Sequence, residues 1–222
     1  MTTELFVQGI IFDLDGTLLD THAVTERVYT AEALKYNLDP APILSYLHGV
    51  PTLQVLQKHY PPSTHTVEYA KGMELDCAKD LDGIAVIPGT LELLKSIPTG
   101  KWSVFTSGMR HLALPRLNHL GIEKPEVFVT PEDIVNGKPH PEGYVEAAKR
   151  MGLDSRDCVV FEDAAAGIRS GCSAGAVVVG VRTQLSDKEL RDAGASYTIK
   201  DMTKVKASLN QDGLLAITID ET

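Results

Sequence analysis

Two aspartates separated by one residue follow an apolar run near the start of the chain. Residues 10–12 (Ile-Ile-Phe) lead into Asp13 and Asp15, and Gly16 comes next. This pattern predicts a buried strand that carries the acids to its carboxyl end, where open α/β sheets bind ligands. If the strand continued, alternation would point both aspartates to the same face, and Gly16 would permit a turn. Two carboxylates that close together need a divalent cation or a retained proton, although an ordinary strand end with an Asp-Gly turn explains this segment alone.

A second apolar run ends in hydroxyl and glycine residues. Residues 102–105 lead into Thr106, Ser107 and Gly108, just before a helical pattern. A hydroxyl donor together with backbone N–H groups at a helix amino terminus is suited to binding phosphate. An ordinary helix N-cap explains the segment equally well.

Two later segments add a lysine and an acid pair. Lys138 lies between a glycine and a proline ahead of a helical pattern, and Glu162 and Asp163 follow the apolar run 158–161. Taken singly, a loop lysine is usually a solvated charge, and acids at a helix start stabilise that helix. The four segments in this order are much more specific than any one of them.

The chain alternates between strand and helix patterns after a long helical insert. Residues 23–81 carry helical patterns punctuated by prolines, and from Pro88 onward five strands are predicted. This alternation predicts an α/β fold with a Rossmann-like parallel sheet, formed by residues 1–18 and 86–222 and interrupted by a helical domain at 19–85. Residues 214–219 alternate weakly and predict an edge strand or a hairpin arm.

The composition argues against several partners. The chain has 222 residues, is 43% hydrophobic and carries 21 basic against 30 acidic residues, a formal charge of −9. An acidic chain without a basic run is not typical of proteins that bind nucleic acid or an anionic membrane surface. Three cysteines without a Cys-x-x-Cys pair, and an amino terminus without a signal-peptide pattern, favour a cytoplasmic location. We expect a monomer.

The four segments together resemble the motifs of the haloacid dehalogenase-like superfamily. The stretch from Asp13 to Thr17 is similar to the first motif, Thr106 to the second, Lys138 to the third, and Glu162 with Asp163 to the fourth. The similarity spans nearly the whole chain. It implies a hydrolase core with an inserted helical cap.

The resemblance also implies a mechanism. Asp13 would be the nucleophile that forms an aspartyl-phosphate, and Asp15 the general acid and base. Mg²⁺ would be bound by the Asp13 carboxylate, the backbone carbonyl of Asp15 and Asp163, with Glu162 supporting the site through water. An acid at position 15 suits an oxygen leaving group, which favours phosphoryl transfer over C–Cl or C–P cleavage.

The resemblance assigns the remaining core residues to the phosphoryl group. Thr106 and the backbone of Ser107 and Gly108 would hold its oxygens, while Lys138 would neutralise both the nucleophile and the phosphate. Thr17 would order the loop through its hydroxyl.

The region 48–52 resembles the substrate loop of yeast-type 2-deoxyglucose-6-phosphate phosphatases and, less closely, of glycerol-phosphate phosphatases. It implies a small sugar or polyol monophosphate as substrate, contacted by His48, Gly49 and Thr52. Those relatives usually have an arginine before the threonine that corresponds to Thr52, whereas this chain has Pro51. The difference removes a guanidinium that could bind substrate hydroxyls or a second phosphate.

Two alternatives remain open. A β-phosphoglucomutase-like phosphotransferase has the same core motifs, but it must grip a second phosphate, and residues 45–58 contain no arginine. A phospho-acceptor signalling module also combines acids, a hydroxyl and a lysine around an aspartyl-phosphate. Such a module is far shorter and lacks a long helical insert after its first strand.

Overall fold

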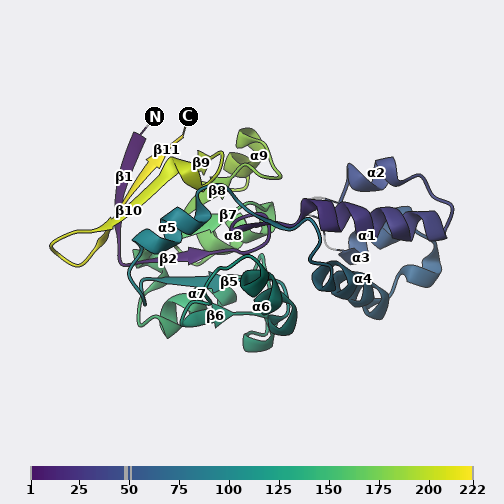
Figure 1. The fold of residues 1–222 in the computed structure, drawn as a ribbon, viewed down its shortest axis with the longest axis horizontal. Helices are drawn as coiled ribbons and strands as arrows, with labels where there is room; N and C mark the ends of the chain where they lie inside the picture. The colour runs from purple at the N-terminus through teal and green to yellow at the C-terminus, as the bar shows by residue number, and fades with distance from the viewer. Residues whose placement is uncertain (1, 48–49, 51, 222) are drawn as a thin grey trace. The chain divides into compact units, whose positions relative to one another are not determined.

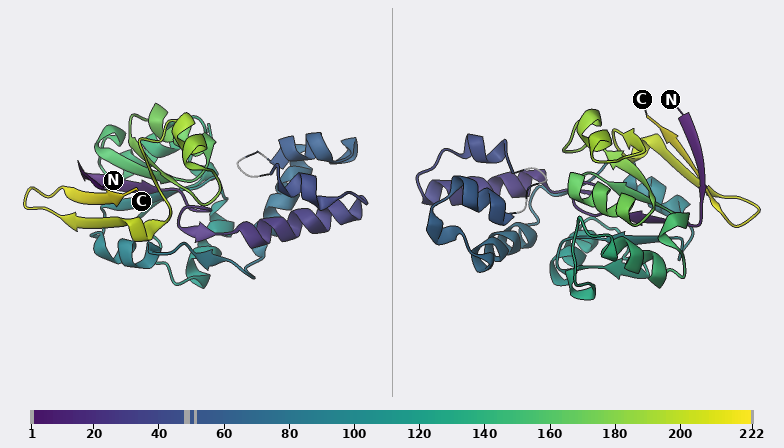
Figure 2. Two further views of the ribbon diagram at one scale, coloured as in Figure 1. Left: turned by 90° about the horizontal axis from the view of Figure 1, so that it is seen from above. Right: turned by 180° about the vertical axis from the view of Figure 1, so that it is seen from behind.

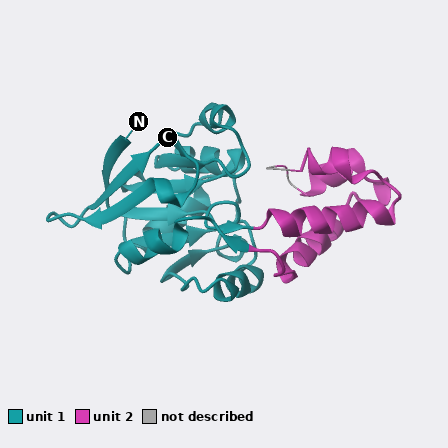
Figure 3. Ribbon diagram, turned by 45° about the horizontal axis from the view of Figure 1, so that its top comes forward, with its two compact units in different colours: residues 1–20, 85–222 teal, residues 21–84 magenta. Residues whose placement is uncertain are grey.

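The protein forms two compact units. The computed structural model describes residues 2–47, 50 and 52–221. Unit 1 comprises residues 1–20 and 85–222, and unit 2 comprises residues 21–84 (Figure 3). The expected division after residue 18 moves to residue 20 because β3 (Leu19–Asp20) pairs antiparallel with β4 (Ala85–Val86) in unit 1.

Unit 1 is built on a parallel six-stranded sheet with the strand order β6-β5-β2-β7-β8-β9 (Figure 1). The first of these strands in the chain lies in the middle of the sheet, so the chain extends the sheet first on one side of β2 and later on the other. The parallel α/β core expected from the sequence is therefore confirmed. The strands are β2 (Gly9–Phe12), β5 (Trp102–Phe105), β6 (Val127–Val129), β7 (Cys158–Glu162), β8 (Val177–Val181) and β9 (Tyr197–Ile199).

Both faces of this sheet are covered, which explains why its strands are apolar without interruption. Ile10 and Phe12 point into one buried cluster and Ile11 into another. Two helices and a small antiparallel sheet contribute to the first cluster, and three helices to the second. Figure 2 shows the ribbon of this unit in two further views. The helices are α5 (Thr90–Ser96) and α6 (Arg110–His119) on the first face, and α7 (Glu142–Arg150), α8 (Ala165–Ser173) and α9 (Asp187–Asp192) on the second.

A separate three-stranded antiparallel sheet joins the two ends of the chain. Strand β11 (Leu215–Asp220) lies between β1 (Thr2–Val7) and β10 (Val205–Leu209). The expected hairpin arm is confirmed, but β11 is a central strand because β1 pairs along its free side. Four short 3-10 helices complete the described elements: η1 (Pro62–Thr64), η2 (Pro131–Asp133), η3 (Ser155–Asp157) and η4 (Met202–Lys204).

Unit 2 is helical and has its own core. Tyr29, Ala33, Leu56 and Met73 are among the buried residues that its helices bring together. The Thr66 side chain caps the last of these helices by accepting a hydrogen bond from a backbone N–H. The helices are α1 (His22–Lys35), α2 (Pro40–Leu44), α3 (Thr52–His59) and α4 (Val67–Lys79). No helix within the described residues is long and apolar enough to cross a membrane.

The packing of α7 on β5 predicts a strong effect of one added methyl group. A Cβ at Gly143 would lie 2.0 Å from Cζ of the buried Phe105 ring, so we expect Gly143→Ala to lower the free energy of unfolding by about 1–3 kcal/mol. The matched control is Gly72→Ala in α4, where a Cβ meets no atom within 4 Å. That change should raise stability by up to ~1 kcal/mol through helix propensity. Urea unfolding followed by circular dichroism tests the pair, and equal effects would contradict the packing.

Candidate active site

The carboxyl ends of three neighbouring strands bring the predicted motifs together. Asp13 follows β2, Thr106 follows β5, and Asp163 follows β7. The parallel register pairs Phe12 with both Val104 and Phe161, so these strands end at the same level (Figure 1). Strands β5 and β7 flank β2 on its two sides, so the chain direction along the sheet reverses at β2. Open α/β sheets bind ligands at the carboxyl ends of the strands at such a point.

The turn after β2 gives the two aspartates different environments. The strand ends at Phe12, so the alternation expected to place both side chains on one face does not extend to them. Gly16 has a φ of 89°, a conformation that favours glycine. Its carbonyl accepts a 2.5 Å hydrogen bond from the Thr183 hydroxyl. The turn therefore positions the acids, and the loop after β8 supports it.

Lys138 links two of the carboxylates. Its ammonium group donates hydrogen bonds to Asp13 and, at 2.6 Å, to Oε1 of Glu162. The Tyr144 hydroxyl donates to the same Glu162 oxygen at 3.0 Å, and the other Glu162 oxygen accepts from the backbone of Ala164 at 2.9 Å. Glu162 thus fixes the position of the lysine that binds Asp13.

Burial strongly perturbs these groups. Desolvation raises the pKa of Asp13 to about 7, with Lys138 opposing the rise and Glu162 adding to it. Burial and the nearby charges of Asp13 and Glu162 raise the pKa of Asp163 well above its usual value. Burial would lower the pKa of Lys138, but the same two neighbouring carboxylates raise it above its usual value. The lysine therefore stays charged, while Asp13 and Asp163 resist ionisation.

The acidic residues suit a divalent cation. One carboxylate oxygen from each of Asp13, Glu162 and Asp163 lies within 4.8 Å of the other two. Oδ2 of Asp163 is buried and has no hydrogen-bond partner among the described residues. A Cβ at Gly16 would lie 2.1 Å from that oxygen, so the glycine keeps space beside it. Oδ1 of Asp163 accepts a 3.3 Å hydrogen bond from Thr17, which orders the loop as expected. An ionised oxygen buried without a donor is costly unless a cation binds it.

The loop after β5 lies beside Asp15. Thr106 is buried, and its hydroxyl oxygen accepts a 3.0 Å hydrogen bond from the backbone of Gly108. Ser107 is exposed. A Cβ at Gly108 would lie 3.8 Å from Oδ2 of Asp15. The hydroxyl and the glycine that the sequence assigned to phosphate binding thus lie beside the second aspartate.

The predicted substrate-loop residues lie elsewhere in the chain, in or next to unit 2. Thr52 begins α3, and its hydroxyl accepts a 3.1 Å hydrogen bond from Tyr29. His48, Gly49 and Pro51 lie outside the described residues. Their assignment to the substrate stays a prediction.

Comparison with known proteins places this geometry in a family. Residues 7–175 match the model of the haloacid dehalogenase-like hydrolases, a span that includes all four motifs. The chain belongs to the haloacid dehalogenase-like hydrolases. The family resemblance and the expectation of a hydrolytic enzyme are therefore confirmed.

Individual relatives of this hydrolase agree with the resemblance. It is 34% identical to 2-deoxyglucose-6-phosphate phosphatase 1 of Saccharomyces cerevisiae, over 95% of this chain and 94% of the relative. It is 30% identical to glycerol-1-phosphate phosphohydrolase 2 of the same yeast, over 91% and 86% of the two chains. The crystal structure of a β-phosphoglucomutase from Clostridium difficile superposes with a TM-score of 0.71 at 25% identity, covering 90% of this chain and 93% of that one.

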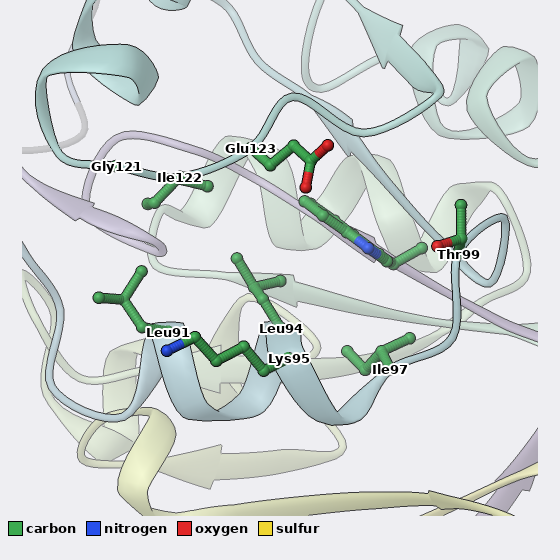
Figure 4. A pocket seen from close by; sticks show the side chains of 9 residues that line it. Leu91, Leu94, Lys95, Ile97, Thr99, Gly121, Ile122 and Glu123 are labelled. Carbon is green, nitrogen blue, oxygen red and sulfur yellow. The ribbon is translucent and has the colours of Figure 1, made fainter.

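A pocket of unit 1 lies away from the acids of the hydrolase. It has a volume of about 320 Å³, and its lining includes Trp102 at the start of β5, whereas Thr106 follows the other end of that strand. Figure 4 shows Leu94 and Ile122 around the same space. Its lining is mainly apolar and contains none of the motif residues, so it is not the candidate active site.

Three contributors to the site were not found from the sequence. Tyr144 and Thr183 form the hydrogen bonds described above. The third is Arg116 of α6, whose Nη1 donates a 2.6 Å hydrogen bond to Oδ1 of Asp15. Tyr144 follows Lys138 by six positions, which is a weak signal. Arg116 and Thr183 lie in segments whose patterns give no sign that they turn toward the site.

The raised pKa of Asp13 predicts a pH-dependent response to Mg²⁺. Because its pKa rises from 3.8 to about 7 on folding, the metal-free folded state binds more protons than the unfolded state between these values. Its free energy of unfolding should therefore fall as pH rises from about 4 to about 7. Mg²⁺ requires ionised ligands, so its stabilisation should grow over the same range. We expect saturating Mg²⁺ to raise the melting temperature by about 5 °C or more at pH 8, and by much less at pH 5.

Differential scanning fluorimetry of EDTA-treated protein measures this response. Asp163→Asn is the matched variant, since it removes a charge from the acidic cluster and should abolish the Mg²⁺ shift at pH 8. A shift of equal size at both pH values, or one retained by Asp163→Asn, contradicts the metal assignment.

Proposed function

We propose that this hydrolase is a Mg²⁺-dependent phosphatase that acts on small sugar or polyol monophosphates through an aspartyl-phosphate on Asp13. The observation that carries the proposal is the position of Asp13 at the end of β2, bound by the ammonium group of Lys138 in a buried acidic site. The relatives named as sugar-phosphate and glycerol-phosphate phosphatases support the substrate class.

The reaction follows from the residues of this site. A carboxylate oxygen of Asp13 attacks phosphorus, the bond from phosphorus to the substrate oxygen breaks, and Asp15 donates a proton to that oxygen. Asp15 then accepts a proton from water, whose oxygen attacks the same phosphorus and releases inorganic phosphate together with the free Asp13 carboxylate. Lys138, fixed by Glu162 and Tyr144, balances the negative charge near the nucleophile throughout.

The proposed metal ligands are Asp13, Asp163 and the backbone carbonyl of Asp15. Glu162 accepts hydrogen bonds from Lys138 and from the backbone of Ala164, so its proposed main role is to hold the lysine. Any contact of Glu162 with the metal would be made through water. Bound Mg²⁺ would supply positive charge opposite the phosphoryl oxygens. Phosphate monoester hydrolysis requires accelerations up to ~10²¹, so the nucleophile, the lysine and the general acid must act together with the cation.

A phosphotransferase remains the second candidate, because the superposed β-phosphoglucomutase has the same fold. The two differ in the acceptor of the phosphoryl group. Free phosphate released from monophosphates favours the phosphatase, whereas a requirement for a bisphosphate primer favours the mutase. A monomeric, cytoplasmic enzyme without nucleic-acid or membrane partners is our accompanying expectation, based on charge and cysteine pattern.

Asp13→Asn should abolish phosphate release, because the amide cannot act as the attacking nucleophile. Release from a panel of C2 to C7 sugar and polyol monophosphates, measured with and without Mg²⁺, tests the proposal. The wild type should be active on some of them, and activity should vanish after exhaustive EDTA treatment. Substantial turnover by a folded Asp13→Asn variant, or full activity in EDTA, would overturn the mechanism.

The segment 48–52 is proposed to select the substrate. Thr106 and Lys138 serve the phosphoryl group that all monoesters share, so they do not discriminate among sugars. Pro51→Arg should change kcat/KM for sugar phosphates by about tenfold or more, equivalent to 1.4 kcal/mol. Activity on p-nitrophenyl phosphate should change much less. Parallel changes on both substrates, or none, contradict this role.

A further inference from the structure

A buried arginine reaches the active site from helix α6. Arg116 lies in the second half of that helix, and only 9% of its side chain is exposed. Its Nη1 donates a 2.6 Å hydrogen bond to Oδ1 of Asp15, which lies 101 positions earlier in the chain. A guanidinium buried this deeply needs a carboxylate partner, and here the partner is the residue two positions after the nucleophile.

The contact gives the two oxygens of the Asp15 carboxylate different surroundings. Oδ1 is bound by Arg116, while Oδ2 points toward the loop after β5, 3.8 Å from where a Cβ on Gly108 would lie. The Asp15 side chain is 28% exposed, so burial alone does not fix its rotamer. The guanidinium is the charged group that the described structure places on this carboxylate.

We propose that Arg116 is a positioning residue that fixes the Asp15 carboxylate with Oδ2 directed at the leaving and attacking oxygens. The inference rests on the proposed phosphatase function. Proton transfer depends steeply on geometry, and a displacement of 1 Å can cost roughly 10² in rate. Arg116 is proposed to act through its hydrogen bond to Asp15.

A second arginine on the same helix provides an internal comparison. Arg110 pairs with Asp133, and its exposed fraction of 36% is much larger. Asp133 also binds Arg150 at 3.0 Å, so this network ties α6 to α7 away from the catalytic carboxylates. Arg110→Gln therefore removes an arginine–carboxylate pair from α6 and leaves the Asp15 contact in place.

A double-mutant cycle tests the proposal. The variants are Arg116→Gln, Asp15→Asn and the pair together, and the readouts are kcat and KM for glycerol phosphate and p-nitrophenyl phosphate. Arg116→Gln should lower kcat for glycerol phosphate about ten- to a hundredfold, with KM changed less than threefold. The loss should be much smaller for p-nitrophenyl phosphate, whose leaving group departs with little protonation. In the Asp15→Asn background, Arg116→Gln should cost less than twofold more.

Further variants separate positioning from folding. Arg110→Gln should leave kcat within threefold of wild type. Arg116→Lys retains the positive charge and should therefore lose less activity than Arg116→Gln. If Arg116→Gln does not fold, Arg116→Lys replaces it in the double-mutant cycle. Additive losses of kcat in the cycle, or equal losses on both substrates, overturn the positioning role of Arg116. The proposed phosphatase function still stands in that case if the wild type releases phosphate. A wild type without activity on any monophosphate overturns both.

Discussion

The hydrogen bonds and ion pairs that Lys138 forms with Asp13 and Glu162 are the interactions on which the site depends. Asp13, Glu162 and Asp163 converge at the ends of β2 and β7, and burial together with the neighbouring acids raises the pKa of Asp13 and of Asp163. The lysine compensates part of that charge at the cost of being buried itself, and Glu162 and Tyr144 hold it in place. A buried ion pair of this kind is weak evidence for stability, but it specifies where the nucleophile sits.

The excess of acidic groups at the site underlies the proposed binding of a divalent cation. Four carboxyl groups at the site, including that of Asp15, accompany the two cationic side chains of Lys138 and Arg116, so full ionisation of the acids would leave two negative charges in excess. In the proposed mechanism, a bound divalent ion would balance this excess. The sheet makes the arrangement possible, because its parallel strands end at one level and Gly16 turns the chain without obstructing Asp163.

The sequence predicted the parts of the site that directly follow strands, and missed the parts contributed by helices α6 and α7 and by the loop after β8. Asp13, Thr106 and Asp163 could be brought together in advance because apolar runs ending in polar residues mark the carboxyl edge of a parallel sheet. Lys138 was placed there by family resemblance. Arg116 was not predictable, since an arginine in a helix is ordinarily solvated and its burial depends on tertiary packing. The alternation that a continuing strand would impose on Asp13 and Asp15 does not apply, because β2 ends at Phe12. The weak strand β1 escaped notice, since its stability comes from pairing with β11 rather than from its own pattern.

The short ladder of β3 and β4 has a consequence for how such a protein can change. Leu19 pairs with Val86 and Asp20 with Ala85, so the chain leaves the sheet-bearing unit and returns to it at adjacent positions. The described residues between them, within unit 2, form a core of their own. The helical unit is thus an insertion whose two ends leave unit 1 from two paired strands, about one strand spacing apart. Evolution, or a protein engineer, can exchange it for another helical module in one piece without refolding the sheet that carries the acidic site.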